Sequence, residues 1–277
     1  MKKFFAIMTV TLTITAFSYG QKTNKILEEG ILLYRLEKAA WYGTDFFLGN
    51  FPHKKDFAGG YVSYLNERNQ IVSAFFEKEN PLRILARLEF ESFPQENPIR
   101  IDTLNQVATS IEVELITLKQ NAIQRLNQNE DGFFTFYENT SFNFIPLIQG
   151  KQRRVFILTA PTIPDVVLIG NDYLLTYNNK NRFVGKEKIH NSILQFSAKS
   201  GDPENKITST HHTHVLSPLI TSTDICTLLL NRDFVEWETH YVISEKYVSC
   251  FNLETTNLSV ITKKEWDKIH ELQKNNK

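Results

Sequence analysis

The run Ile207-Thr-Ser-Thr-His-His-Thr-His-Val-Leu-Ser-Pro-Leu-Ile-Thr-Ser-Thr-Asp-Ile-Cys-Thr-Leu-Leu-Leu230 carries most of the chemical information in this chain. Its first part, rich in threonine and histidine, predicts a β-strand. A short loop with one proline follows. Thr221-Ser-Thr-Asp224 then opens an apolar run that predicts a helix. The stretch therefore predicts a strand-loop-helix unit within an α+β fold.

The spacing of the histidines indicates a metal site. Side chains two residues apart in a strand point to the same face, so His212 and His214 should project together and His211 away from them. Asp224, in the first turn of the helix, can fold back as a third ligand. Three protein ligands leave a fourth position for water, as in catalytic zinc centres. We therefore take zinc as the candidate cofactor.

This pattern resembles the zinc motif of the JAMM (JAB/MPN) metalloproteases. In that family a His-x-His pair is followed, after a loop, by Ser-x-x-Asp at a helix start. The resemblance is close over Ile207–Leu230 and extends loosely to Trp237–Leu253, where two strands should follow the helix. It implies a JAB/MPN-like C-terminal half that cleaves an amide or isopeptide bond in a protein or peptide substrate.

The resemblance also implies roles for single residues. It makes His212, His214 and Asp224 the zinc ligands. The family's serine falls on Thr221 or on Ser222, and either hydroxyl would hydrogen-bond the developing oxyanion.

The family's general base is a glutamate upstream of the histidine pair. This chain has no glutamate between Glu138 and Glu187, so these two residues are the candidates for the base. The alternative function is a non-catalytic exported domain that keeps the scaffold and binds a partner, a polymer or a metal. A carboxylate within hydrogen-bond reach of water on the metal would distinguish the two.

A purely structural role for Asp224 also stays open. Thr221-x-x-Asp224 before an apolar run is typical of a capping box, which would stabilise the helix by about 1 kcal/mol. The wider C-terminal half resembles exported bacterial proteins, and that likeness implies no activity.

The composition indicates a folded globular protein. The chain has 277 residues, of which 42% are hydrophobic and 22% charged, enough for a sizeable core in one or two domains. The formal net charge is zero, which argues against a nucleic-acid partner.

Residues 1–20 have the pattern of a signal peptide. Lys2 and Lys3 precede the apolar run Phe4–Phe17, and Ser18-Tyr-Gly20 places small residues at a cleavage site. We expect a periplasmic or secreted protein with no stable membrane anchor after cleavage; a retained N-terminal anchor is the alternative. An exported compartment permits a disulfide between Cys226 and Cys250, and two buried thiols are the other interpretation.

The remaining periodicity predicts flanking helices and mixed or antiparallel sheets. Helices are expected at Ile26–Tyr42, ending at Gly43, and at Lys263–Gln273. A third should run from a cap at Asp102 or Thr103 to about Asn127. Its apolar stripe is Leu104, Val107, Ile111, Leu115, Leu118, Ala122 and Leu126.

The predicted strands are distributed over both halves of the chain. Tyr61–Tyr64 and Ile71–Phe76 form a hairpin, and Arg83–Glu91 forms a further strand. A soft boundary near Asn129–Gly132 would separate an N-terminal α+β region, 21–130, from a C-terminal α+β region, 131–277.

Overall fold

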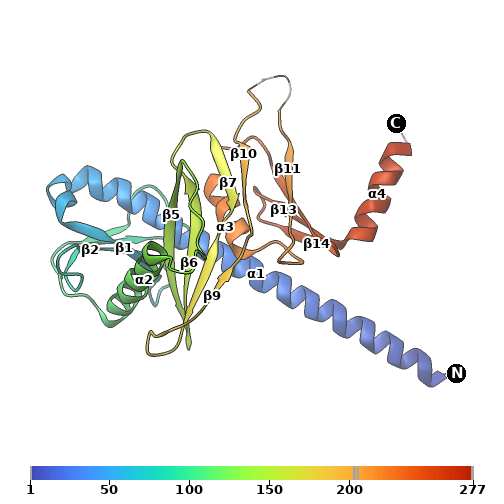
Figure 1. Cartoon of the computed structure of the whole chain (residues 1–277), viewed down its shortest axis with the longest axis horizontal. Coiled ribbons are helices and arrows are strands. Elements are labelled where there is room, and N and C mark those ends of the chain that lie inside the picture. The colour runs from blue at the N-terminus through green and yellow to red at the C-terminus, as the bar shows by residue number, and fades with distance from the viewer. Residues whose placement is uncertain (1, 202–203, 205, 276–277) are drawn as a thin grey trace. The chain divides into compact units, whose positions relative to one another are not determined.

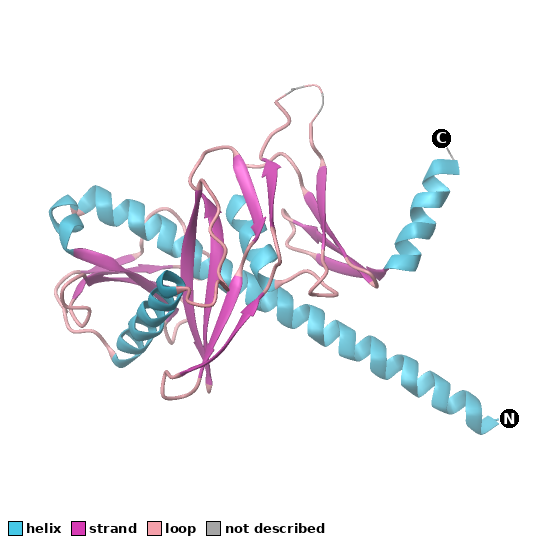
Figure 2. Cartoon of the chain, in the orientation of Figure 1, coloured by secondary structure: helices cyan, strands magenta, loops and turns pink. Residues whose placement is uncertain are grey.

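A computed structural model of the chain describes residues 2–201, 204 and 206–275 (Figure 1). The chain divides into two compact units. The terminal unit comprises Met1–Ile31 with Ala198–Lys277, and the central unit comprises Leu32–Ser197. The predicted α+β class, with mixed and antiparallel sheets and flanking helices, is confirmed (Figure 2). The expected boundary near residues 129–132 lies inside the central unit.

Helix α1 (Lys2–Asn50) is longer than the predicted helix. It continues beyond Gly43 because its last turns are anchored by packing: Phe47 is 1% exposed and its ring stacks on Phe75, with centroids 4.5 Å apart. The expected cleavage position after Gly20 lies within α1. In the part of the chain that is described, no helix combines the length and apolar character needed to span a membrane.

The first sheet of the central unit is antiparallel, in the order β1-β2-β3-β4. A 3₁₀ helix, Pro52–Phe57, leads into it. The predicted hairpin is confirmed, and its turn is held by the Asn66 side chain, which accepts hydrogen bonds from the backbone of Arg68 and Gln70. The strands are β1 (Ala58–Leu65), β2 (Ile71–Glu77), β3 (Ile84–Phe90) and β4 (Arg100–Asp102).

Helix α2 (Ser110–Gln128) starts later than predicted. The proposed caps Asp102 and Thr103 are wrong: Asp102 ends β4, and its carboxylate instead accepts hydrogen bonds from the backbone of Leu104 and Asn105. The observed cap is Thr109, which forms a capping box with Glu112. As a result, Leu104 and Val107 leave the apolar stripe and are 92% and 75% exposed.

Helix α2 packs between two sheets of the central unit, as Figure 1 shows for the green helix beside β1 and β5. The second sheet is antiparallel, with strands β5 (Thr140–Gln149), β6 (Gln152–Pro161), β8 (Tyr173–Tyr177) and β9 (Phe183–Lys188). One face of α2 packs with Val155 and Leu175 of this sheet, and the other packs with Val62 and Ala74 of the first. Strands β7 (Val166–Gly170) and β10 (Ile193–Ser197) form a separate antiparallel pair.

The terminal unit contains the strand-loop-helix stretch. Strand β11 (Ser209–Thr213) is followed by helix α3 (Ser222–Asn231), and then by β12 (Thr239–Ile243), β13 (Tyr247–Asn252), β14 (Leu258–Thr262) and helix α4 (Lys263–Asn275). Strands β11 and β12 pair in parallel, with α3 as the crossover, and the other pairs are antiparallel. Both cysteines are present as thiols, Cys226 buried and Cys250 half-buried.

A close approach between α1 and α3 shapes the terminal unit. A Cβ atom at Gly30 would lie 2.6 Å from the Ile225 Cβ and 3.0 Å from the carbonyl oxygen of Ser222. Only glycine lets the two helices come this near without a shift. The neighbouring Glu29 is thereby brought to the start of α3, where its Oε2 accepts a hydrogen bond of 2.9 Å from Ser222.

Candidate metal centre

The side chains alternate along β11 as predicted, and the alternation continues to His214, one residue beyond the end of the strand. His212 and His214 are 4% and 7% exposed, whereas His211 points the other way and is exposed. The imidazoles of His212 and His214 lie side by side, with ring centroids 4.6 Å apart. Strand geometry therefore brings two nitrogen ligands into the interior of the terminal unit.

Asp224 serves the helix cap and faces both histidines. One carboxylate oxygen, Oδ2, accepts hydrogen bonds from the backbone and the hydroxyl of Thr221, at 2.8 and 2.7 Å. The same carboxylate faces His214 Nε2 at 3.3 Å and His212 Nε2 at 3.8 Å. The capping box and the histidine contacts are thus combined in one residue, which is 1% exposed.

The distances in this cluster suit a metal ion. One ligand atom each from His212, His214 and Asp224 lie within 4.8 Å of one another. Two ligand atoms at about 2.0–2.2 Å from a tetrahedral zinc ion lie about 3.3–3.6 Å apart. The separations of 3.3 and 3.8 Å between imidazole and carboxylate are close to that range. The buried histidine–aspartate cluster is therefore compatible with a metal site.

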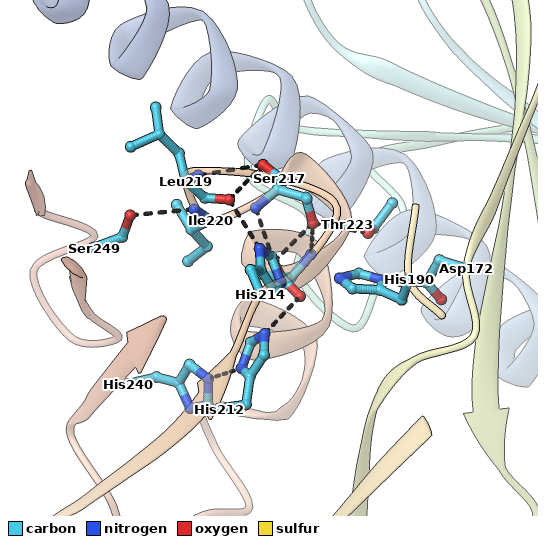
Figure 3. Close-up of polar contacts among 12 residues, drawn as sticks. Asp172, His190, His212, His214, Ser217, Leu219, Ile220, Thr223, His240 and Ser249 are labelled. Carbon is cyan, nitrogen blue, oxygen red and sulfur yellow. Dashed lines mark hydrogen bonds and ion pairs between the residues drawn. The ribbon is translucent and has the colours of Figure 1, made fainter. Parts of the chain in front are cut away.

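Hydrogen bonds at the far side of each ring favour the ligating tautomer. His214 Nδ1 lies 2.9 Å from the carbonyl oxygen of Leu219, to which it can only donate. The ring therefore keeps its Nε2 lone pair for a metal. His212 Nδ1 lies 2.7 Å from His240 Nε2, as Figure 3 shows with a dashed line. Such partners on the second ring nitrogen are a regular feature of metal-binding histidines.

His240 links this arrangement to a second strand. Its Nδ1 lies 2.7 Å from Thr210 Oγ1, and Thr210 pairs with His240 in the parallel register of β11 and β12. Burial, reinforced by the neighbouring His212, lowers the pKa of His240 to about 3. His240 is therefore neutral near neutral pH, and its Nε2 can accept the proton of His212 Nδ1 if its own Nδ1 donates to Thr210.

The two hydroxyl candidates have distinct partners. Thr221 Oγ1 is occupied by the cap, since it bonds to Asp224 and lies 3.1 Å from Thr223 Oγ1. Ser222 instead donates to Glu29. Glu29 is not among the candidates that the sequence pattern indicates, because it is remote from the motif in the chain and reaches Ser222 only where α1 packs against α3.

The two predicted base candidates belong to the central unit. Glu138 lies just before β5, Glu187 lies in β9, and both side chains are exposed. In the same unit, His190 lies beside Asp172, with its Nδ1 3.3 Å from Asp172 Oδ2, and Figure 3 labels both residues.

Comparison with protein-family models, with curated proteins and with solved structures finds no match for this chain. We therefore describe this chain by its structure alone. It is an α+β protein whose terminal unit contains a buried histidine–aspartate cluster compatible with a metal site.

Proposed function

We propose that this chain is a zinc-dependent hydrolase of amide or isopeptide bonds, with His212, His214 and Asp224 as the zinc ligands. The observation that carries the proposal is the convergence of the three ligand atoms within 4.8 Å inside a buried cluster. Two nitrogens and one carboxylate oxygen are a donor set that zinc prefers, and three protein ligands are typical of catalytic zinc sites. The JAMM-like order of these residues in the sequence supports the reaction class.

Zinc held by these residues would lower the pKa of its bound water to about 7 and so would supply a nucleophile at neutral pH. The chain itself must then provide a group that accepts and returns a proton. We assign this role to Glu29, in place of Glu138 and Glu187. The support for this assignment is the 2.9 Å hydrogen bond that Ser222 donates to the Glu29 carboxylate. Ser222 stands two positions before Asp224 in the chain, so the bond holds Glu29 at the start of α3.

Ser222 would orient Glu29 and, once that carboxylate is protonated, turn its hydroxyl toward the developing oxyanion. Thr221 has the supporting role of fixing the Asp224 carboxylate. Glu29 would finally return its proton to the departing amine, which restores the starting charges.

A non-catalytic metal-binding domain is the second candidate. The observation in its favour is the double use of Asp224, because a capping carboxylate that also holds a metal can serve folding alone. In that case the metal would stabilise the contact between α3 and β11.

For the place of action we propose the periplasm or the extracellular space, on the basis of the signal-peptide pattern in residues 1–20. The substrate would be a protein or peptide in that compartment. Detection of a mature chain that begins at Gln21, in the exported fraction of the cell, tests this part separately.

Hydrolysis of a panel of fluorogenic peptide and isopeptide substrates tests the reaction. Protein treated with a chelator should be inactive, and added zinc should restore activity. Glu29→Gln should retain zinc and lose activity by about 10²–10⁴-fold, the usual contribution of a general base. Glu28→Gln, the neighbouring change on α1, is the matched control. Full zinc occupancy with no cleavage of any substrate would contradict the hydrolase and favour the second candidate.

A further inference from the structure

A cleft opens beside the candidate metal centre in the terminal unit. It has a volume of about 530 Å³ and is lined by His214, by the loop Val215–Pro218 and by the turn Ser244–Lys246. Ligand sites in proteins typically have volumes of about 300–1,000 Å³. Because His214 is both a cleft residue and a candidate zinc ligand, a molecule bound in the cleft lies next to the centre.

The walls of this cleft are tied to each other. The backbone N–H of His214 donates to the carbonyl of Ile243 at 2.8 Å, and Ser244 Oγ donates to the carbonyl of Pro218 at 2.8 Å. Ser217 closes its own loop by donating to Leu219. The cleft is thus formed before any ligand arrives, which lowers the cost of binding.

The chemistry of the lining indicates the occupant. Val215 and Leu216 are 79% and 51% exposed on one wall, so two apolar side chains face water beside a buried cluster. The opposite turn carries one acidic and one basic side chain, Glu245 and Lys246, both exposed. A polypeptide suits both walls, because one short segment can place an apolar side chain against the first wall and its polar groups against the second.

We propose that this cleft is the substrate subsite, and that it binds a polypeptide segment with an apolar side chain seated against Val215 and Leu216. The segment would extend from there past His214, which would place one of its amide bonds at the metal centre. The role of the cleft as a substrate subsite rests on the proposed function, whereas binding of the peptide requires neither zinc nor turnover.

Binding of labelled peptides to the chelator-treated full chain tests the subsite without any catalytic readout. The probes are fluorescein-labelled glycine-serine hexapeptides that differ only at one central position, leucine or serine. The leucine peptide should bind at least about tenfold more tightly, a difference of about 1.4 kcal/mol. The variant Val215→Ser with Leu216→Ser should abolish that difference.

Leu272→Ser is the matched control, because Leu272 is a 55% exposed apolar residue of the same unit on α4, outside the cleft. It should leave both affinities unchanged. Equal binding of the two peptides to the unmodified chain, or an equal loss in Leu272→Ser, would overturn the subsite. A chain that binds the leucine peptide selectively but cleaves nothing would retain the subsite and refute only the hydrolase.

Discussion

His240 Nε2 lies 2.7 Å from Nδ1 of His212, and both rings are buried in the terminal unit. The parallel pairing of β11 and β12 creates this contact between residues that are far apart in the chain. Since the pKa of His240 is lowered to about 3 by burial, the ring is a neutral partner near neutral pH. Its hydrogen bond leaves His212 Nε2 directed toward Asp224.

His240→Phe should therefore weaken zinc binding. Loss of a hydrogen-bond partner on a ligating histidine typically costs about 10–100-fold in metal affinity. The measurement is a competition titration against a zinc chelator of known affinity. His53→Phe is the control, since His53 is exposed in a 3₁₀ helix of the central unit. Unchanged zinc affinity in a folded His240→Phe protein would show that His240 does not support His212 as a ligand.

Gly30→Ala should destabilise the chain although alanine favours helices. The new Cβ would meet the Ile225 Cβ at 2.6 Å and force α1 away from α3, at a cost of about 1–3 kcal/mol. Gly49→Ala, in the same helix with nothing within 4 Å of the added atom, should instead stabilise by about 0.5–1 kcal/mol. Urea unfolding of the two variants compares them, and effects of the same sign would contradict the close approach.

Glu112→Gln should destabilise the central unit strongly. Glu112 is 0% exposed and holds Arg87 through hydrogen bonds of 2.7 and 2.8 Å. Removal of one partner from a buried ion pair typically costs about 3–5 kcal/mol. Arg83→Gln is the control, because its ion pair with Glu77 is exposed and should be worth less than about 1 kcal/mol.

The effect of Glu112 should also depend on pH. Burial raises the pKa of this carboxyl, but the bonds from Arg87 and Thr109 outweigh burial, and the net pKa is lowered. Below the unfolded-state pKa the unfolded chain binds the proton more readily, so stability falls as the pH falls. Urea midpoints of the unmodified chain and Glu112→Gln should therefore converge as the pH falls below 4.5, the ordinary pKa of a glutamate. A gap that widens in acid would contradict this.

The corrected start of α2 can be tested with two leucines that share the predicted stripe. Leu115→Ala should cost about 2–5 kcal/mol, because Leu115 is 1% exposed. Leu104→Ala should change stability by less than about 0.5 kcal/mol, since Leu104 is 92% exposed. Thermal unfolding of the two variants distinguishes these outcomes. Comparable losses of stability would favour the longer helix that the sequence predicts.

Local patterns explain what could be predicted from the sequence. The alternation of His211 and His212, the capping box of Thr221 and Asp224, and the turn after β1 depend on neighbours within a few residues. The predicted start of α2 was wrong for a local reason as well. The helical spacing of Leu104 continues that of the true helix, yet Asp102 pairs in a sheet and binds the backbone that follows it.

The partners of the candidate centre could not be predicted, because they depend on tertiary pairing. His240 reaches His212 through the register of two parallel strands, which a lone histidine in a predicted strand does not reveal. Glu29 reaches Ser222 because Gly30 lets α1 approach α3. The only signal in the sequence was an unexplained glycine inside an amphipathic helix.

Zinc content is the most direct test of the central claim. The chain should be purified without a histidine tag, and zinc and protein quantified together, for the unmodified chain, His212→Ala and His211→Ala. The two variants change neighbouring residues of one strand, one buried and one exposed. We predict about one zinc per chain, retained in His211→Ala and lost in His212→Ala. No zinc in the unmodified chain, or equal zinc in both variants, would contradict it.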